Sequence, residues 1–333
     1  MKAIVLAGGE GKRLKAVTGD LPKPMAPILG KPVMERILEL LRAHGITDIC
    51  ATVKYNPGPI LDHFGDGSAF GVRLTWSVET EALGTAGGVA NCRDFWNGED
   101  FLVISGDAAC DFDLTRFVRD HEAHRPAASI ALYPHPEPLR YGLALTDRTG
   151  RILRFTEKPA WEQVLTNLIN TGIYILSPRA MDRVPRGIPY DFGKELFPAL
   201  LDGGEELRGI IMDGYWCDIG TPRAYYQCCL DALDGRYAIP DRPEEPPLPR
   251  YDPPAAPGRQ QRRVLCRDRA GVMRAVSSAM LELGADFSDG VVFGDGTATV
   301  RIHPDSRESA ILVESDDSAA ADAFAAFVEK QST

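Results

Sequence analysis

Two stretches near the start of the chain carry residues suited to binding a polyphosphate. Three glycines lie within four residues, at Gly8, Gly9 and Gly11, and Arg13 follows them. Glycines let a backbone approach a bulky anion and direct successive N–H groups at it, and an arginine can donate two hydrogen bonds to phosphate oxygens. The spacing is neither that of a P-loop nor that of a dinucleotide-binding turn. A tight turn with a solvated arginine is the alternative interpretation.

The second stretch is Leu21–Pro24, in which two prolines flank Lys23. Because proline fixes φ, this lysine is held on a stiff backbone. A stiffened cation near a glycine-rich anion loop suits a triphosphate. A surface lysine in a proline turn is the alternative, and the pairing with the first loop favours phosphate binding.

Two aspartates at the ends of predicted strands could bind a hard cation. Asp107 follows the apolar run Phe101–Ser105 and one glycine, and Asp218 lies in a second short apolar stretch before Gly220. A carboxylate at a strand end can bind Mg²⁺ through oxygen. The two aspartates are far apart in the sequence, so only the fold could bring them together, and surface Asp-Gly turns remain the alternative.

A third group of polar residues lies further along the chain. Lys158 stands beside a proline, as Lys23 does, and could hold a second, separate phosphate. Asn170 and Thr171 carry hydrogen-bonding groups appropriate to sugar hydroxyls.

The elements that must position these residues alternate between strands and helices. A helix is predicted at Pro32–His44, and a hairpin joins Leu143–Thr146 to Ile152–Phe155. The other predicted strands are Lys2–Ala7, Ile49–Val53, Leu74–Val78, Phe101–Ser105, Ser129–Tyr133 and Gly172–Leu176. Such alternation predicts a largely parallel sheet with helices on both faces. Ligands then bind at the carboxyl ends of the strands, where the candidate residues lie.

Length and composition predict more than one domain. The chain has 333 residues, and eight of the 18 residues from Pro240 to Pro257 are proline. Proline disfavours helix at the residue before it, so this stretch is predicted to be an extended spacer. The predicted domains are residues 1–237 and 262–333, with 238–261 as a Pro-rich linker.

Charge and cysteine content exclude several classes of function. Lys and Arg number 37 against 47 Asp and Glu, a net charge of −10, so general nucleic-acid binding is not expected. No apolar run reaches the ~18–20 residues of a membrane helix, and the N-terminal apolar run is too short for a signal peptide. The seven cysteines include no CxxC pair, which predicts reduced thiols in a cytoplasmic protein.

Seven motifs, taken in order, resemble the sugar-1-phosphate nucleotidyltransferase family over about residues 1–236. They are GGEGKRL (8–14), LPKPM (21–25), ALGTAGG (82–88), SGDA (105–108), EKP (157–159), NTG (170–172) and WCDIG (216–220). Within the family the closest likeness is to bacterial mannose-1-phosphate guanylyltransferases fused to a phosphomannomutase-like region. The resemblance implies a Rossmann-like α/β fold with a mixed, mostly parallel sheet and helices on both faces.

The tail, residues 262–333, resembles the last domain of those fusions, which is similar to the small α+β C-terminal domain of phosphohexomutases. Arg301 is kept from the phosphate loop of that domain, but acidic residues follow where a phosphate would bind. The β-helix and the other mutase domains have no counterpart in the sequence. A structural or oligomerising role, giving a homo-oligomer through the tail, is therefore expected instead of mutase activity.

The resemblance implies that the protein makes a nucleotide-sugar and pyrophosphate from a nucleoside triphosphate and a sugar 1-phosphate with Mg²⁺. GTP and mannose 1-phosphate, giving GDP-mannose, are the expected pair. The implied catalytic residues are Arg13, Lys23, Asp107 and Asp218, and the two aspartates would hold the metal. The implied nucleotide-binding residues are Leu6, Ala7, Gly8, Gly9, Gly11, Arg13, Lys23, Leu83, Gly84, Thr85, Ala86 and Gly106. The implied sugar-phosphate-binding residues are Tyr141, Gly142, Glu157, Lys158, Asn170 and Thr171.

Three alternatives remain open. The same chemistry could use another sugar 1-phosphate, of the heptose or glucose type, or another triphosphate (UTP, dTTP or CTP). A non-catalytic regulatory paralogue that binds nucleotide-sugar is the rival from another class. Retention of Arg13, Lys23, Asp107, Lys158 and Asp218 argues against it. A dinucleotide-binding oxidoreductase is disfavoured because the glycine spacing is wrong.

Overall fold

The structure is a computed structural model that describes residues 1–239, 260–266, 269–283, 291–294, 299–305, 310–315 and 317–331. It forms two compact units. The first comprises residues 1–10, 22–24 and 34–216, and the second comprises the described parts of 11–21, 25–33 and 217–333. Most of the predicted Pro-rich linker, residues 240–259, lies outside the described residues. The division into domains at residues 237 and 261 stays a prediction.

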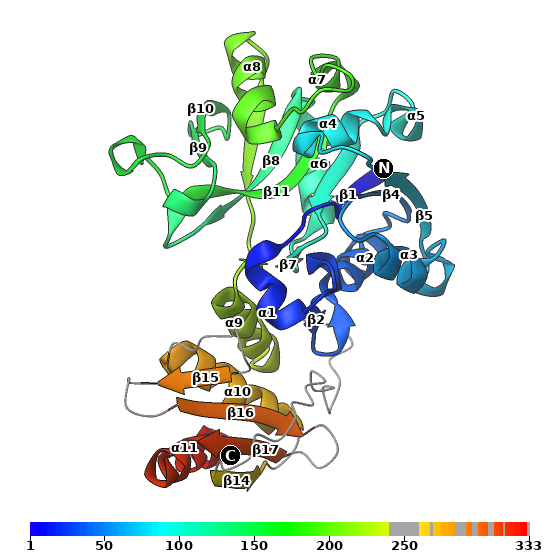
Figure 1. Ribbon diagram of the computed structural model, residues 1–333. Coiled ribbons are helices and arrows are strands. Elements are labelled where there is room, and N and C mark those ends of the chain that lie inside the picture. Colours follow the sequence, from blue (N-terminus) through cyan, green and yellow to red (C-terminus); the bar gives the residue numbers. More distant parts are fainter. Residues whose placement is uncertain are drawn as a thin grey trace. The chain divides into compact units, whose positions relative to one another are not determined.

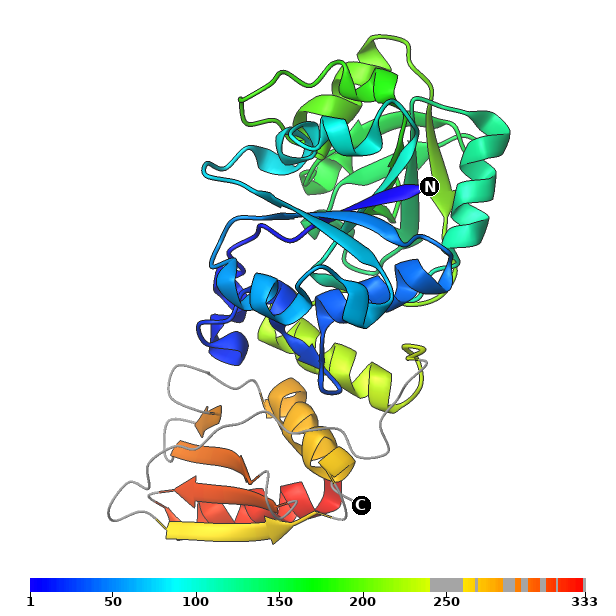
Figure 2. The ribbon, with the colours of Figure 1, turned by 90° about the vertical axis from the view of Figure 1, so that its right-hand side faces the viewer.

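A nine-stranded mixed sheet organises the first unit (Figures 1 and 2). Its order is β10-β9-β11-β6-β1-β4-β5, and β8 pairs with both β11 and β12. The strands are β1 (Lys2–Leu6), β4 (Asp48–Val53), β5 (Arg73–Val78), β6 (Phe101–Ser105), β8 (Ala128–Pro134), β9 (Leu143–Thr146), β10 (Ile152–Thr156), β11 (Leu168–Leu176) and β12 (Leu207–Ile211). Every strand predicted from the sequence is present, within a few residues at its ends.

The strands that lead to the candidate residues run parallel. Val5 of β1 lies opposite Ala51 of β4 and Ile104 of β6, and β5 continues the parallel series beside β4. β1, β4 and β6 are mostly apolar on both faces because both faces are covered, as is typical of parallel sheets, whereas the edge strand β5 is partly exposed. β11 pairs antiparallel with β6 and β8, and β9 and β10 form the predicted hairpin. The prediction of a mixed, mostly parallel α/β sheet is confirmed.

Helices lie on both faces of this sheet (Figures 1 and 2). They are α2 (Val33–Ala43), α3 (Gly58–Phe64), α4 (Gly84–Ala90), α5 (Arg93–Trp96), α6 (Leu114–His124), α7 (Pro178–Met181) and α8 (Phe197–Asp202). The shorter elements are η2 (Lys23–Met25), η3 (Ser68–Phe70), β7 (Ala108–Cys110), η4 (Pro138–Arg140), η5 (Trp161–Gln163), the π-helical turn η6 (Phe192–Leu196) and β13 (Trp216–Asp218). In α2, Val33, Ile37, Leu38 and Leu41 are fully buried, which confirms the predicted apolar face.

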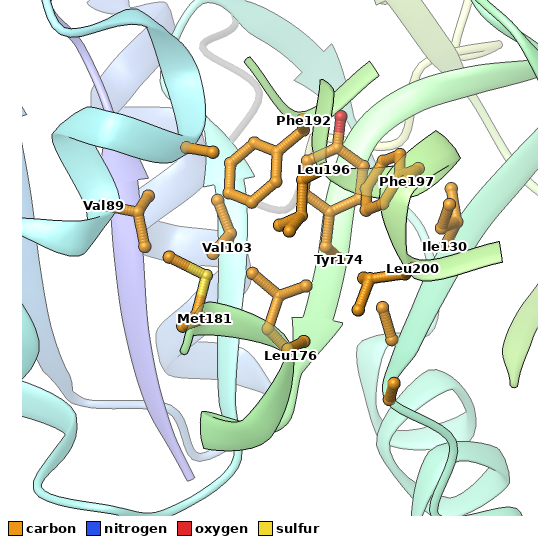
Figure 3. Packing of buried hydrophobic residues seen from close by; sticks show 14 of the residues in the cluster. Val89, Val103, Ile130, Tyr174, Leu176, Met181, Phe192, Leu196, Phe197 and Leu200 are labelled. Atoms are coloured by element: carbon orange, nitrogen blue, oxygen red, sulfur yellow. The ribbon is translucent and has the colours of Figure 1, made fainter. Parts of the chain in front are cut away.

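An aromatic cluster anchors η6 to the sheet. The ring of Phe192 lies 4.9 Å from that of Tyr174 in β11 and 5.7 Å from that of Phe197. Figure 3 shows these three rings packed with Leu196 and Leu200. Burial of one such side chain contributes about 1.5–3 kcal/mol. The cluster therefore holds the short segment just before and within η6 in a fixed position.

The second unit contains short elements and an α+β tail. Its elements are η1 (Lys12–Leu14), α1 (Lys15–Thr18), β2 (Pro27–Ile28), β3 (Lys31–Pro32), α9 (Pro222–Leu233), β14 (Gln260–Leu265), α10 (Arg269–Leu283), β15 (Val291–Gly294), β16 (Thr299–Asp305), β17 (Ala310–Ser315) and α11 (Ser318–Gln331). The tail strands form an antiparallel sheet in the order β14-β17-β16-β15. Arg301 lies in β16, and residues 306–309 of the predicted phosphate loop lie outside the described residues. The likeness to a phosphohexomutase domain stays a prediction.

Candidate functional site

A cavity of about 620 Å³ lies at the carboxyl ends of the parallel strands of the first unit. This is the edge at which open α/β sheets bind ligands, and the volume is within the range of ~300–1,000 Å³ usual for small-molecule sites. The residues that line the cavity are Leu6, Gly8, Gly9, Glu10, Thr52, Lys54, Tyr55, Asn56, Glu79, Ala82, Gly84, Thr85, Ser105, Asp107 and Asp191. Six of them (Leu6, Gly8, Gly9, Gly84, Thr85 and Asp107) were predicted from the sequence.

The glycines of the first loop leave space open toward the cavity. A Cβ added at Gly9 would meet no atom within 4 Å, and one at Gly8 would make ordinary contact with Lys54. The fold therefore does not need glycine at position 9, whereas a ligand close to the backbone would. Ala7 and Gly106 lie beneath this layer: Ala7 is buried, and a Cβ at Gly106 would lie 2.8 Å from Val5 Cγ1.

The loop that begins α4 is fixed by a segment about a hundred residues away. Gly84 has φ +69°, and a Cβ there would lie 2.7 Å from the Tyr190 carbonyl oxygen. The backbone N–H groups of Ala86 and Gly87 both donate to that oxygen at 2.9 Å. Thr85 Oγ1 accepts a hydrogen bond from the Phe192 N–H at 3.0 Å. Leu83 and Ala86 are buried, so they support the loop from beneath.

Lys23 and Asp107 form an ion pair beside the cavity. Lys23 Nζ lies 3.0 Å from Asp107 Oδ2, with side-chain exposures of 9% and 32%. Lys23 is fixed within the turn η2, and Asp107 reaches the cavity from the end of β6. Lys23, which was predicted to bind a triphosphate, therefore lies directly beside Asp107, the first of the two predicted metal ligands.

Arg13 and Asp218 gather at another glycine, within the second unit. A Cβ added at Gly220 would lie 2.9 Å from Asp218 Oδ1 and 3.2 Å from Arg13 Nη2. Gly11 has φ +62° and precedes η1, which carries Arg13 on its exposed surface. Asp107 belongs to the first unit and Asp218 to the second. Their meeting around one metal ion stays a prediction.

Glu157 lies in a slot between two glycines. A Cβ at Gly142 would lie 2.6 Å from Glu157 Oε2, and a Cβ at Gly193 would lie 2.5 Å from it. Burial raises the pKa of the Glu157 carboxyl, and the nearby ammonium groups of Lys158 and Lys194 oppose that rise. A carboxylate held in this way has little freedom to turn away from a ligand.

Lys158 and Asn170 are joined by backbone hydrogen bonds to Tyr141 and Gly142, the residues at one wall of the Glu157 slot; the Asn170 N–H donates to the Gly142 carbonyl oxygen at 2.7 Å. Lys158 adopts a left-handed backbone with φ +43°, and its N–H donates to the Tyr141 carbonyl oxygen at 3.2 Å. A non-glycine residue in this region is strained, which is common at functional sites. The ring of Tyr141 packs edge-on against Trp216 at 5.5 Å.

Asn170 and Thr171 differ in their burial and in their hydrogen-bond partners. Asn170 donates from Nδ2 to the Tyr174 hydroxyl at 2.9 Å, and its Oδ1 accepts from the Gly172 N–H at 3.0 Å. Asn170 is half-buried, so it can still reach a ligand. Thr171 is 2% exposed, and its hydroxyl donates to the Ala131 carbonyl oxygen at 2.7 Å. Thr171 therefore supports the sheet through its side chain.

The sequence analysis gave no binding role to eight polar residues that line the cavity: Glu10, Thr52, Lys54, Tyr55, Asn56, Glu79, Ser105 and Asp191. Lys54 and Glu79 directly follow β4 and β5, so the rule of strand ends applied to every predicted strand would have found them. Glu79 is half-buried, and burial raises its pKa, while the Leu83 N–H and the Lys54 charge act in the opposite direction. Its carboxylate lies against Gly88, where no Cβ would fit. Asp191 follows no strand, and no sequence pattern marks it.

The carboxylates beside the cavity suit a metal ion whose other ligands are water and substrate oxygens. Among the described residues no group of three or more His, Cys, Asp or Glu side chains could enclose an ion. Mg²⁺ needs only one or two protein carboxylates when water and substrate phosphates supply the rest. The partly exposed carboxylate of Asp107 fits that requirement.

A mixed α/β sheet whose strand ends border a glycine-lined cavity, with the buried ammonium group of Lys23 beside it, is an arrangement suited to binding a nucleotide. Residues 2–235 match the protein family described as "Nucleotidyl transferase", and the chain belongs to that family. In the described residues no helix is both long enough and apolar enough to span a bilayer.

Two curated relatives differ in the substrates that their names state. The chain is 43% identical over 246 residues to a UTP–glucose-1-phosphate uridylyltransferase of Synechocystis sp., covering 70% of the chain and 63% of the relative. It is 34% identical over 234 residues to a mannose-1-phosphate guanylyltransferase of Mycobacterium tuberculosis, covering 70% of the chain and 65% of the relative. The matched region thus spans slightly less than two thirds of each relative's length.

A solved structure supports the fold. HddC from Yersinia pseudotuberculosis, complexed with GMP-PN, is 29% identical with a TM-score of 0.60, over 69% of this chain and 99% of that one.

Proposed function

We propose that the protein transfers a nucleotidyl group from GTP to mannose 1-phosphate, giving GDP-mannose and pyrophosphate. The observation that carries this proposal is the cavity at the strand ends, with the open Gly9 backbone and the ion pair between the buried Lys23 and the partly exposed Asp107 on its border. This arrangement suits an extended polyanion, because it combines close backbone approach with a fixed ammonium group.

The chemistry needs positioning and charge neutralisation more than a strong base. An oxygen of the sugar 1-phosphate is already anionic, and it attacks the α-phosphorus of the triphosphate. The bond from the α-phosphorus to the bridging oxygen breaks, and pyrophosphate leaves with that electron pair. Lys23, Arg13 and the backbone N–H groups of the Gly8–Gly11 loop bind the leaving phosphates. Asp107 and Asp218 are the residues that would hold Mg²⁺, which would supply neutralisation of the phosphate charge.

Glu79 supports guanine as the base. Its carboxylate is half-buried on the cavity wall beside the loop that begins α4. A carboxylate can accept both the N1–H and the N2–H₂ hydrogen bonds of guanine. Uracil and thymine offer one N–H donor between two carbonyl oxygens, which a carboxylate would repel. Adenine and cytosine place a ring-nitrogen acceptor beside the amino group. Guanine is thus the base that satisfies both oxygens.

The sugar 1-phosphate binds on the Glu157 side of the cavity. Lys158 neutralises its phosphate, Glu157 accepts hydrogen bonds from the sugar hydroxyls, and Asn170 donates to them. Asp191 lines the cavity and acts electrostatically on Glu157, which supports a sugar subsite next to the nucleotide. A carboxylate and an amide at fixed positions can discriminate sugar epimers because a misplaced hydroxyl leaves them unpaired.

UTP with glucose 1-phosphate is the second candidate, because the Synechocystis relative at 43% identity bears that name. Heptose 1-phosphate and the other triphosphates keep the same chemistry. A non-catalytic nucleotide-sugar-binding protein is the remaining alternative.

Pyrophosphate release across a grid of substrates tests the proposal. GTP, UTP, dTTP, CTP and ATP are each combined with mannose, glucose and heptose 1-phosphates, with Mg²⁺ and with chelator. The proposal expects the largest kcat/KM for GTP with mannose 1-phosphate and none with chelator. A preference for UTP and glucose 1-phosphate would replace the substrate pair. Binding of GDP-mannose without turnover of any pair would establish the non-catalytic alternative.

The tail is proposed to act in assembly. Truncation after residue 239, followed by sedimentation and assay, tests this. Loss of a homo-oligomer is expected, and an unchanged assembly state would contradict it.

A further inference from the structure

The segment Tyr190–Gly193 contacts both proposed subsites of the first unit. The Tyr190 carbonyl oxygen accepts two hydrogen bonds from the loop that begins α4, donated by the N–H groups of Ala86 and Gly87. The Tyr190 N–H also donates to the Leu83 carbonyl oxygen at 2.9 Å. The loop that borders the nucleotide cavity and this segment are therefore joined along their backbones.

The other end of the segment meets Glu157. Gly193 is buried, and a Cβ there would lie 2.5 Å from Glu157 Oε2 and 3.3 Å from Phe155 Cε1. The glycine at 193 thus forms one wall of the slot that holds the carboxylate, and Gly142 forms the other. Any side chain at 193 would have to displace the Glu157 carboxylate.

Ring contacts and hydrogen bonds hold the segment in place. The ring of Phe192 packs against the rings of Tyr174 and Phe197, and its N–H donates to Thr85 Oγ1. The Asp191 N–H donates to Glu195 Oε2 at 2.6 Å. The π-helical turn η6 begins at Phe192, and such turns frequently occur at functional sites. A displacement of the loop near Thr85 would therefore move Gly193.

We propose that Gly193 is a positioning residue for the sugar 1-phosphate, and that the Tyr190–Gly193 segment sets Glu157 in register with the nucleotide cavity. The proposal rests on the proposed function, since it assigns Glu157 to the sugar. Gly193 itself touches neither substrate. It acts by leaving the space in which the Glu157 carboxylate lies, and Thr85 acts by fixing the segment through Phe192.

Gly193→Ala is the direct test. A carboxylate displaced by about 1 Å is expected to lower kcat/KM for the sugar 1-phosphate by about 100-fold, while the dissociation constant of GDP stays within twofold. Gly58→Ala is the matched control: a Cβ there meets no atom within 4 Å, so neither quantity should change. Circular dichroism and Tm establish that each variant is folded.

A double-mutant cycle separates positioning from a general structural role. Glu157→Asp shortens the side chain and makes room for the alanine. If Gly193 acts through Glu157, the two changes are non-additive, and the double variant is no worse than Glu157→Asp alone. Additive losses would overturn the proposal. So would a Gly193→Ala variant that weakens GDP binding as much as it weakens use of the sugar 1-phosphate.

Thr85 provides a second variant that does not touch the slot. Thr85→Val removes the acceptor for the Phe192 N–H and keeps the side-chain shape, whereas Thr85→Ser keeps the acceptor. We expect the valine variant alone to raise the KM of the sugar 1-phosphate at saturating GTP, by about tenfold. Equal KM values in the two variants would contradict a link through Phe192.

Calorimetry separates failure of this proposal from failure of the proposed function. GDP and GDP-mannose are titrated into wild-type protein and Gly193→Ala. Absence of turnover in the wild type would contradict the proposed activity alone. Equal affinity of wild type and Gly193→Ala for GDP-mannose would overturn the positioning role, whether or not turnover occurs.

Discussion

Lys23 Nζ lies 3.0 Å from Asp107 Oδ2, and Lys23 is only 7% exposed. An ammonium group nearly removed from water requires an opposite charge nearby, and Asp107 supplies it while also lining the cavity. A divalent ion that binds Asp107 must therefore share the carboxylate with an ammonium group. We infer that the metal binds together with the triphosphate, whose negative charge offsets both cations.

Asp107→Asn tests the importance of this carboxylate. The variant keeps the size of the side chain and an oxygen acceptor for Lys23, but it loses the charge that would bind a metal. Turnover is expected to fall by at least about 100-fold at saturating Mg²⁺, and Tm should also fall because the buried ammonium group of Lys23 loses its opposite charge. Asp213→Asn serves as the control, because that side chain is 92% exposed and paired with Arg116. Turnover near that of wild type would rule out Asp107 as a metal ligand.

Gly9→Ala tests whether the first loop lies against phosphate. The new methyl group meets no protein atom within 4 Å, so Tm should not change. If the triphosphate lies against the backbone, the methyl group displaces it, and the KM of GTP should rise about tenfold or more. Gly106→Ala should instead affect stability, because its Cβ would lie 2.8 Å from Val5 Cγ1. We expect this variant to destabilise the fold by about 1–3 kcal/mol. An unchanged KM in Gly9→Ala would place the triphosphate elsewhere.

The framework that positions the site was predictable because it depends on local patterns. The apolar runs at β1 and β6, the apolar face of α2 and the turn between β9 and β10 each follow from residue type and spacing within about ten residues. The position of the cavity followed from the predicted parallel strands, since their carboxyl ends meet at one edge.

The segment Tyr190–Gly193 was not predictable because its contacts are distant in the sequence. Tyr190 is fixed by Ala86 and Gly87, and Gly193 is needed only because Glu157 lies against it. No local periodicity records either relationship. Glu79 lies between these cases: its place after β5 was predictable, but its burial depends on the missing side chain of Gly88.

Glu79→Gln is expected to lower the selectivity for guanine and to raise the stability of the fold. A glutamine presents one acceptor and one donor, so the preference for GTP over UTP should fall by about 10–100-fold in kcat/KM, as expected for one charge-assisted hydrogen bond. A preference unchanged from wild type would exclude Glu79 from base recognition.

The pH dependence of the same variant follows from the raised pKa of Glu79. Burial favours the protonated carboxyl in the folded state, so the free energy of unfolding falls as the pH rises from the unfolded-state pKa of Glu79 to its raised folded-state pKa, and it stays lowered above that pKa. Below the pKa of the unfolded chain this penalty is absent. Glu79→Gln should therefore have a higher Tm than wild type at pH 7, and the difference should vanish toward pH 4. A difference that grows on acidification would contradict the burial argument.

Lys158 provides a test in which backbone strain and charge are separated. Its φ of +43° disfavours any residue except glycine by about 1–2 kcal/mol. Lys158→Ala and Lys158→Gly both remove the ammonium group, so both should raise the KM of the sugar 1-phosphate by about 10–100-fold and leave GDP binding unchanged. The glycine variant alone relieves the strain, so its free energy of unfolding should exceed that of the alanine variant by about 1 kcal/mol. Equal free energies of unfolding for the two variants would indicate that the backbone at position 158 leaves the left-handed conformation once the lysine side chain is removed. An effect on GDP binding would place the ammonium group on the nucleotide instead of the sugar phosphate.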